Sequence, residues 1–338
     1  GGMGMVASIE DYSAAIAIPQ MVKAPELRGG HPVQKNGRLL RYAGGFCVVY
    51  PYETARRKYA VRCWHTSVDT VQQYQKTIAD RIKGFDLPYF VDYKYCENAI
   101  LTAKGLQPVI LMDWVDAKPM KKYIADNLSR PSALESLARA FLEMTRELHE
   151  QGISHGDLQH GNILIRPDGS LVLVDYDSLY VLGMDGIPDD IKGLQGYQHP
   201  ARIHQRYRSA YSDFFSELVI YTSIRTLAKH PGLWNKYSLA DTETMLFTEK
   251  DIQSGGTSEI FRLIESDRDI RYLGRAIKDA LRQPSLDRIV PLQDIVKGQA
   301  DSVVENLSKQ WLSQTCQPSA FQSNIDIFNQ LAEIASRW

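Results

Sequence analysis

The stretch Ile153–Tyr180, ISHGDLQHGNILIRPDGSLVLVDYDSLY, has the clearest structural pattern in this chain. It holds two apolar runs of the kind that forms strands, Asn162–Ile165 and Leu171–Val174. Between them lies Pro167-Asp168-Gly169, which is a strong turn signal. The sequence therefore predicts a β-hairpin over this stretch.

Polar side chains stand at both ends of the expected hairpin. Asp157 and Asn162 precede the first run, and Asp175 follows the second. Because the start of one strand lies beside the end of its hairpin partner, Asn162 and Asp175 should come close together, with Asp157 on the entering loop. Oxygen ligands of this kind suit Mg²⁺ that is held together with the phosphates of a substrate. A simpler interpretation is also open, in which Asp157 caps a turn and Asp175 is a solvated acid.

The spacing H-x-D-x-x-x-x-N, followed by an apolar hairpin and an Asp, resembles the catalytic loop and magnesium-binding Asp of the protein-kinase-like superfamily. In this sequence the four residues are His155, Asp157, Asn162 and Asp175. The resemblance implies that Asp157 accepts or orients the proton of the acceptor hydroxyl. It also implies that Asn162 and Asp175 hold Mg²⁺ against the phosphates of ATP, and that His155 is structural.

The resemblance implies an α+β, two-lobed protein-kinase-like fold over residues 36–298. We expect an N-terminal lobe over residues 36–115, with a five-stranded antiparallel sheet and one helix, and a mainly helical C-terminal lobe over residues 116–298. Residues 1–35 should form an N-terminal extension with one short helix, and residues 299–338 a C-terminal helical tail. The five strands are expected in the β-rich runs 39–42, 46–50, 59–64, 89–96 and 108–112.

Two features of the expected N-terminal lobe are candidates for binding phosphates. Gly44 lies between the first two strands and falls on a glycine of the kinase Gly-rich loop, although a plain Gly-Gly hairpin turn is an alternative. Arg62 matches the phosphate-binding lysine of the family. Arginine keeps the charge at the phosphates but is longer and planar, and a solvated strand arginine is the alternative.

The apolar run from Val109 to Val115 resembles the last small-lobe strand and the hinge. By this match Met112 lies beside the adenine, and Asp113 and Val115 offer backbone groups to its edge. The run is equally what a buried strand requires, so the assignment depends on its register.

An amphipathic helix is expected over residues 67–83, where the apolar residues are three or four apart: Val71, Tyr74, Ile78 and Ile82. It takes the place of the kinase helix whose Glu pairs with the lysine, but it contains no Glu. The three glutamines at 72, 73 and 75 are polar candidates for an Arg–Gln hydrogen bond, and the pattern does not choose among them.

A longer helix is expected over residues 132–150, with Ser132 as its N-cap and Gly152 closing its C-terminus. Further on, Asp213 opens an apolar helix. It fits the buried Asp that braces the kinase catalytic loop, and a plain Asp at a helix N-terminus is an equal alternative.

Three residues depart from the family pattern near the expected site. Gln159 stands where many Ser/Thr kinases carry a Lys. Gly156 replaces an Arg that often senses a phosphorylated activation loop, which implies little dependence on such phosphorylation. Asp177 replaces the glycine after the metal-binding Asp, so it either restrains that segment or adds an acid near the metal.

The composition is that of a globular protein, with 44% hydrophobic and 23% charged residues. The net charge of -1 argues against a dominant nucleic-acid or anionic-membrane partner, and no apolar run is long enough to span a membrane. The four cysteines show neither a C-x-x-C pair nor zinc-finger spacing. Free cysteines suit a reducing compartment, so we expect a cytoplasmic protein.

The leading hypothesis from these residues is an ATP- and Mg²⁺-dependent phosphotransferase, namely a Ser/Thr protein kinase. The alternatives are a nucleotide-binding pseudokinase that acts as a scaffold or regulator, and a small-molecule phosphotransferase. The segments AVRCW, HGDLQHGN, VDYD and YQHP are similar to those of a bacterial subgroup. That subgroup includes the kinase of the tellurium-resistance-associated kinase, phosphatase and von Willebrand-type triad, which implies a phosphatase or a von Willebrand-type protein as a partner.

Overall fold

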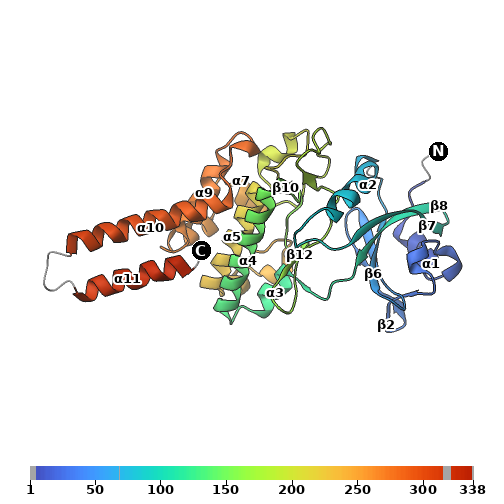
Figure 1. The fold of residues 1–338 in the computed structure, drawn as a ribbon, viewed down its shortest axis with the longest axis horizontal. Helices are drawn as coiled ribbons and strands as arrows, with labels where there is room; N and C mark the ends of the chain where they lie inside the picture. The colour runs from blue at the N-terminus through green and yellow to red at the C-terminus, as the bar shows by residue number, and fades with distance from the viewer. Residues whose placement is uncertain (1–4, 68, 315–320, 337–338) are drawn as a thin grey trace. The chain divides into compact units, whose positions relative to one another are not determined.

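The computed structural model describes residues 5–67, 69–314 and 321–336. The chain divides into two compact units. The first comprises the chain up to residue 118 together with residues 162–179 and 186–190, and the second comprises the remainder. The expected α+β content is present, with the main sheet in the first unit and most helices in the second (Figure 1).

The first unit is built on a six-stranded antiparallel sheet in the order β1-β5-β6-β8-β7, with β4 also paired to β5. Its strands are β1 (His31–Pro32), β4 (Tyr42–Ala43), β5 (Cys47–Glu53), β6 (Lys58–Trp64), β7 (Tyr93–Thr102) and β8 (Gly105–Asp113).

The expectation of five strands is wrong, because the run 39–42 is not one strand. The hairpin of β2 (Gln34–Lys35) and β3 (Arg38–Leu39) ends at the first residue of this run, and β4 begins at its last residue, Tyr42. Asn36 and Gly37 turn this hairpin with φ of 53° and 73°. Positive φ at both central residues is the requirement that makes Asn-Gly a hairpin turn, and this local signal had been missed.

The sheet presents two different faces, which follow from its register. Arg62 pairs with Val49 and Ile110, and Met112 pairs with Ala60, so these side chains share one face. The opposite face forms an apolar core together with the N-terminal segment. Its buried strand residues are Val48, Tyr50, Tyr52, Val61, Cys63, Val109 and Leu111.

The N-terminal extension covers this apolar face. Helix α1 (Ile9–Ile16) begins at Ser8, whose side chain accepts a hydrogen bond from the Asp11 N–H in a capping box. The short 3-10 helices η1 (Pro19–Met21) and η2 (Pro25–Leu27) follow. Tyr12 and Leu27 are each 1% exposed, and both belong to the sheet core. Helix α1 lies where the one short helix of the N-terminal extension is expected, and it belongs to the same compact unit as the sheet.

Helix α2 (Asp69–Lys83) confirms the expected amphipathic helix and lies beside β7. Its buried side chains are Gln75, Ile78, Ala79 and Ile82. The side chain of Val71 lies outside the described residues. Strand β7 starts later than expected because the segment before it is held elsewhere, with the Tyr89 carbonyl accepting from the Leu173 N–H at 2.7 Å.

The expected hairpin in the deciding stretch is confirmed. Strands β11 (Ile163–Ile165) and β12 (Leu171–Leu173) pair antiparallel, and Gly169 supplies the positive φ of 86° in the turn. The Val174 N–H donates to the Asn162 carbonyl at 3.0 Å. The backbone at Asn162 therefore lies opposite the residue before Asp175, as the hairpin pattern predicts.

The second unit is mainly helical. It contains α3 (Met120–Asp126), α4 (Pro131–Glu150), η3 (Pro200–His204), α5 (Phe214–Lys229), α6 (Leu233–Lys236), η4 (Leu239–Asp241), α7 (Glu249–Gln253), α8 (Glu259–Glu265), α9 (Arg271–Leu281), η5 (Leu286–Arg288), α10 (Leu292–Gln314) and α11 (Phe321–Ser336). The short strands β10 (Ile153–Ser154) and β13 (Tyr180–Val181) pair within it, and β9 (Lys118–Pro119) lies at the boundary of the two units.

The ends of α4 correct one expectation and confirm another. Ser132 is not the N-cap, because Pro131 is already the first helical residue and Arg130 precedes it without a side-chain cap. Proline suits this position because its missing N–H would be unpaired there in any case. Gly152 follows the helix with a φ of 67°, as a C-terminal glycine should.

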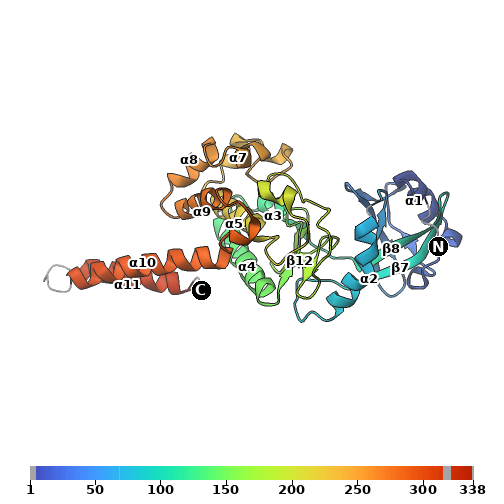
Figure 2. The ribbon, with the colours of Figure 1, turned by 90° about the horizontal axis from the view of Figure 1, so that it is seen from above.

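The last two helices form an antiparallel pair. Figures 1 and 2 both show α10 and α11 side by side, extending from the other helices of the second unit. The expected tail boundary at residue 299 falls inside α10, since that helix begins at Leu292. No helix within the described residues is long and apolar enough to cross a membrane.

A buried ion pair anchors the start of α10 to the helical core. His149 of α4 has its Nε2 2.8 Å from Oε1 of Glu217 on α5, and its Nδ1 2.6 Å from Oε1 of Gln293 on α10. Burial lowers the pKa of His149, but the Glu217 carboxylate raises it more, to about 9. Burial raises the pKa of Glu217 to about 7. Both groups therefore hold protons more tightly in the folded protein.

This pair predicts a loss of stability at alkaline pH. Because the pKa of His149 is raised above its ordinary value of 6.5, its stabilisation is complete below pH 6.5 and is lost as the pH rises through about 9. We expect His149→Gln to melt below the wild type near neutral pH, by about 2–4 °C for each kcal/mol lost, and to lose this pH dependence. Thermal denaturation across this range measures both.

Gln293→Ala is the matched control, since it keeps the charged pair and should keep the pH dependence. Parallel pH curves for His149→Gln and the wild type would contradict the assignment.

Candidate functional site

The centre of the candidate site in the first unit is a buried cluster around Arg62 of β6. Its Nη1 and Nη2 donate to Oδ1 and Oδ2 of Asp177, each at 2.7 Å. Nη2 also donates to Oδ1 of Asp175 at 2.9 Å. Arg62 is 5% exposed and Asp177 is 2% exposed. The guanidinium is therefore held in a forked geometry by one carboxylate and touches a second.

Helix α2 joins this cluster through a neutral side chain. Nε2 of Gln75 donates to Oδ1 of Asp177 at 2.7 Å, and the Tyr93 hydroxyl donates to Oε1 of Gln75. The expected Arg–Gln hydrogen bond is not the contact that forms, because Asp177 lies between the two side chains and bonds to both. Of the three glutamines that the sequence left open, Gln75 is the one at the cluster.

The charges of this cluster stabilise one another in spite of burial. Burial lowers the pKa of Arg62, but Asp175 and Asp177 raise it well above its ordinary value. Burial raises the pKa of Asp177, but the charge and hydrogen bonds of Arg62 and a hydrogen bond from Gln75 lower it more, so its pKa lies below its ordinary value. Both groups are thus charged at neutral pH.

Asp175 has an unusual backbone conformation. Its φ is 63°, in the left-handed region that costs a residue other than glycine about 1–2 kcal/mol. The side chain of the next residue, Tyr176, is fully buried, and its hydroxyl accepts from the Val91 N–H at 3.0 Å. This packing holds the segment in place, while the carboxylate of Asp175 stays 34% exposed. A strained and partly exposed carboxylate is typical of a functional position.

Asn162 and Asp175 both belong to the first unit and lie at the same end of the β11–β12 hairpin. An amide oxygen and a carboxylate are hard ligands that fit Mg²⁺. Among residues 5–67, 69–314 and 321–336, no group of three or more His, Cys, Asp or Glu side chains could form a metal site by itself. The donor set therefore fits a cation that completes its coordination with substrate phosphates and water.

Gly44 lies in the turn between β4 and β5. Its N–H donates to the Cys47 carbonyl at 2.8 Å, and its own carbonyl is 2.8 Å from Nε2 of His65. Neither Gly44 nor Gly45 has a positive φ. A Cβ added to Gly44 would lie 3.6 Å from the nearest atom, and a Cβ added to Gly45 would have no atom within 4 Å. The turn itself therefore does not require glycine.

The hinge candidates continue from β8. Met112 is 5% exposed and lies on the same face of the sheet as Arg62. Asp113 is partly buried, and its carboxylate is 3.1 Å from Nη1 of Arg57. Val115 is partly buried and follows Trp114, whose N–H donates to the Lys58 carbonyl at 3.0 Å.

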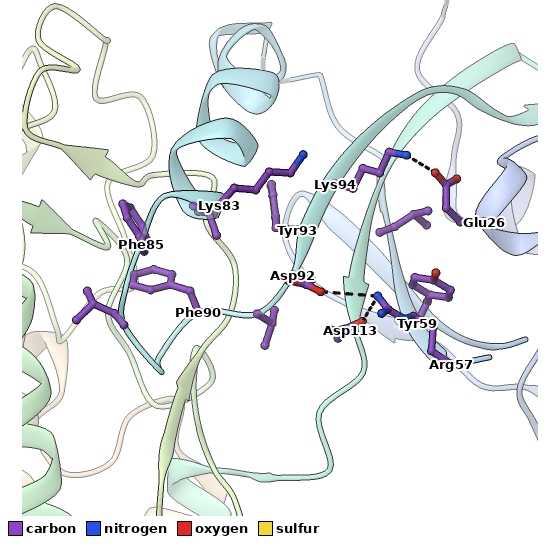
Figure 3. Close-up of a pocket in the computed structure, with 14 residues that line it drawn as sticks. Glu26, Arg57, Tyr59, Lys83, Phe85, Phe90, Asp92, Tyr93, Lys94 and Asp113 are labelled. Carbon is purple, nitrogen blue, oxygen red and sulfur yellow. Dashed lines mark hydrogen bonds and ion pairs between the residues drawn. The ribbon is translucent and has the colours of Figure 1, made fainter.

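A cavity of about 400 Å³ lies in the first unit near the end of α2 and is shown in Figure 3. Ion pairs line its rim, with Arg57 beside Asp92 and Asp113, and Lys94 beside Glu26. Aromatic side chains also line it, namely Tyr59, Phe85, Phe90 and Tyr93. Of the predicted site residues it includes Asp113 alone. Its charged side chains other than Lys83 are already paired, so the cavity gives little indication of a ligand.

In the second unit, a buried carboxylate holds the loop that carries Asp157. Asp213 is 1% exposed and accepts from the N–H groups of His155 and Gly156, at 2.6 and 2.8 Å. His155 is fully buried, and its Nδ1 accepts from the Asp157 N–H at 3.1 Å. Asp213 is therefore the brace of this loop and not a plain helix-terminal acid, and His155 is structural as expected.

A buried arginine that the sequence had not indicated also holds this loop. Nη2 of Arg202 donates to the Gly156 carbonyl at 2.9 Å and to the Ile191 carbonyl at 3.1 Å, and Nη1 donates to Oε1 of Gln198 at 2.9 Å. Arg202 thus connects the Asp157 loop to the segment that follows residue 190. Gln159 does not extend from the loop, since its Oε1 accepts from the Gly161 N–H at 2.6 Å.

The predicted site residues divide between the two units. The first unit contains all of the predicted binding and metal residues, namely Gly44, Arg62, Met112, Asp113, Val115, Asn162 and Asp175, and the second contains Asp157. Asp177 and Gln75 were both noted in the sequence, but their pairing with each other and the fork from Asp177 to Arg62 were not predicted. A signal for Gln75 did exist, because it lies three and seven residues before Ile78 and Ile82, on the buried stripe of α2. Arg202 offered none, since the Gly156 carbonyl that ties it to the Asp157 loop is 46 residues away in sequence.

Comparison with known proteins gives a consistent result. The protein kinase domain model matches residues 43–272. A mitochondrial serine/threonine-protein kinase of Schizosaccharomyces pombe, ppk24, is 26% identical over 45% of this chain and 38% of its own length. The mouse EKC/KEOPS complex subunit Tp53rkb is 29% identical over 38% of this chain and 50% of its own length. The chain thus spans half or less of the length of these relatives.

The contacts of Arg202 predict that it holds the segment from Ile191 to Gln198 in place. Arg202→Lys keeps the charge but cannot reach three acceptors, so we expect amide hydrogen exchange in this segment to rise about tenfold. Exchange measured by mass spectrometry tests this. Arg206→Lys is the matched control, because Arg206 is exposed and lies two residues after the end of η3. Unchanged exchange in Arg202→Lys would show that this arginine does not hold the segment.

Proposed function

We propose, for a chain that belongs to the protein kinase domain family, that it transfers the γ-phosphate of ATP to a protein Ser or Thr hydroxyl with the help of Mg²⁺. The observation that carries this proposal is the pairing of Arg62 with Asp175, at one end of the hairpin that begins with Asn162. A fixed cation and a hard-ligand pair within one unit are what the binding of a nucleotide triphosphate requires.

The residues of the first unit bind and orient the nucleotide in this proposal. Arg62 presents its charge toward the phosphates, and its planar fork is fixed by Asp177. Asp175 and Asn162 hold Mg²⁺, which when bound neutralises the charge that develops on the transferred phosphoryl group. Gly44 keeps the turn above the phosphates free of a side chain, and Met112, Asp113 and Val115 contact the adenine.

Asp157 of the second unit acts on the acceptor. Its carboxylate orients the acceptor hydroxyl and takes its proton as the bond to phosphorus forms. The loop that carries it is held by Asp213 and Arg202 through backbone groups. Neither of these contacts needs a phosphorylated residue, which supports a kinase that works without activation-loop phosphorylation.

A nucleotide-binding pseudokinase is the second candidate function. It is favoured by one observation, the engagement of Arg62 with two carboxylates, since a cation already neutralised attracts phosphate less strongly. In this case the protein would act as a scaffold or regulator. A bacterial origin and a partner phosphatase or von Willebrand-type protein remain proposals that rest on the resemblance of short segments, and a cytoplasmic location is a proposal that rests on the cysteine pattern.

The test is phosphoryl transfer from γ-labelled ATP in the presence of Mg²⁺. We expect the wild type to label itself or a protein substrate, and Asp157→Asn and Asp175→Asn each to lose about a hundredfold or more of the rate, because each removes a group that acts on the reacting atoms. Asp86→Asn, an exposed acid of the first unit, is the control and should keep the wild-type rate.

The other outcomes separate the alternatives. A melting temperature that rises with Mg-ADP, without any labelling, would favour the pseudokinase. Labelling of a free sugar or amino alcohol, but of no protein, would favour a small-molecule phosphotransferase. Equal rates for Asp157→Asn and the wild type would exclude the role given to Asp157.

A further inference from the structure

The phosphate-binding cation of this chain needs a fixed partner. Arg62 is nearly fully buried, and a buried guanidinium is stable only when its donors are satisfied by an opposite charge. Nη1 of Arg62 donates to Oδ1 of Asp177 and Nη2 donates to Oδ2, each at 2.7 Å. This parallel two-bond geometry is the strongest pairing that arginine and a carboxylate can form, and it fixes the plane of the guanidinium.

Among the side chains of α2 that the structure describes, from residue 72 to residue 83, none supplies this charge. The side chain that the helix directs into the cluster is Gln75, a neutral amide that is fully buried. Its orientation is fixed from both ends. Burial raises the pKa of the Tyr93 hydroxyl well above its ordinary value, so the hydroxyl keeps its proton and donates to Oε1. The amide nitrogen of Gln75 is then left to donate to Asp177.

The absence of a glutamate in α2 follows from this arrangement. Arg62 Nη1 and Gln75 Nε2 donate to the same atom, Oδ1 of Asp177. A carboxylate at position 75 would therefore face the Asp177 carboxylate at hydrogen-bond distance, where two like charges destabilise each other strongly. Only one of the two positions can carry the anion, and in this chain it is position 177.

We propose that Asp177 is the positioning residue for Arg62, and that it replaces the helix carboxylate with one from the segment after β12. This inference rests on the proposed function. Asp177 and Asp175 are two residues apart, so the same short segment fixes the phosphate-binding cation and carries the metal-binding carboxylate. The connection of α2 to this pair is neutral and secondary, so a displacement of α2 leaves the Arg62–Asp177 pair intact.

The test moves the carboxylate from one position to the other. Asp177→Asn keeps the shape of the side chain but removes its charge, and we expect it to weaken Mg-ATP binding and raise the KM for ATP about tenfold, with a smaller change in kcat. Gln75→Glu alone should lower the melting temperature. The double variant with both changes should regain affinity to within about threefold of the wild type and regain the melting temperature. Gln75→Ala should bind Mg-ATP with nearly wild-type affinity.

The controls are matched in chemistry and place. Gln73→Glu adds the same charge on an exposed position of α2, and Asp86→Asn removes an exposed acid of the same unit. Both should leave the affinity and the melting temperature unchanged. The proposal is supported if the double variant regains the affinity and melting temperature that the single changes at positions 75 and 177 lose, while neither control changes them.

Two results would overturn it. The first is a wild-type affinity for Mg-ATP in Asp177→Asn, and the second is a double variant no more stable than the sum of its single changes predicts. If Asp177→Asn does not fold, the melting of the double variant decides, since a restored cooperative transition supports the swap and its absence rejects it. The stability measurements need no nucleotide, so they keep their meaning even if the chain proves not to transfer phosphate.

Discussion

The fork of hydrogen bonds between Arg62 and Asp177 is the constraint on which the first unit's site depends. It crosses from the central strand β6 to the segment after β12, so it closes the sheet onto the hairpin that begins at Asn162. Because the pair is buried, its removal from one side only would leave an uncompensated charge. The same contact explains the neutral Gln75 on α2 and the position of Asp175.

In the second unit, the loop that carries Asp157 is held by hydrogen bonds from side chains to its backbone groups. Asp213 accepts from two successive N–H groups, and Arg202 donates to two carbonyls. Side chains that hold a backbone constrain its shape whatever side chains the loop carries. These contacts account for a loop that keeps its shape with Gly156 and Gln159 at positions where the family often has basic residues.

The sequence was most informative where a pattern is local. The hairpin around Gly169, the amphipathic α2 and the glycine after α4 were predicted correctly because each depends on neighbouring residues. The cluster at Arg62 was predicted only in part, because its partners come from residues 75, 93, 175 and 177, and spacing along the chain does not show which of them meet. Asn36-Gly37 was a local signal that had been missed, and with it the correct number of strands.

The layer formed by α1 and the following turns has a practical meaning for any shortened form of this protein. The kinase domain match starts at residue 43, after the whole of that layer. A polypeptide that began there would retain every residue assigned to nucleotide and metal. It would, however, expose Tyr50, Val61 and Leu111 to water as part of one continuous hydrophobic patch. The start of the kinase domain match and the start of the folded unit therefore differ. A protein truncated at residue 43 would expose this surface and aggregate.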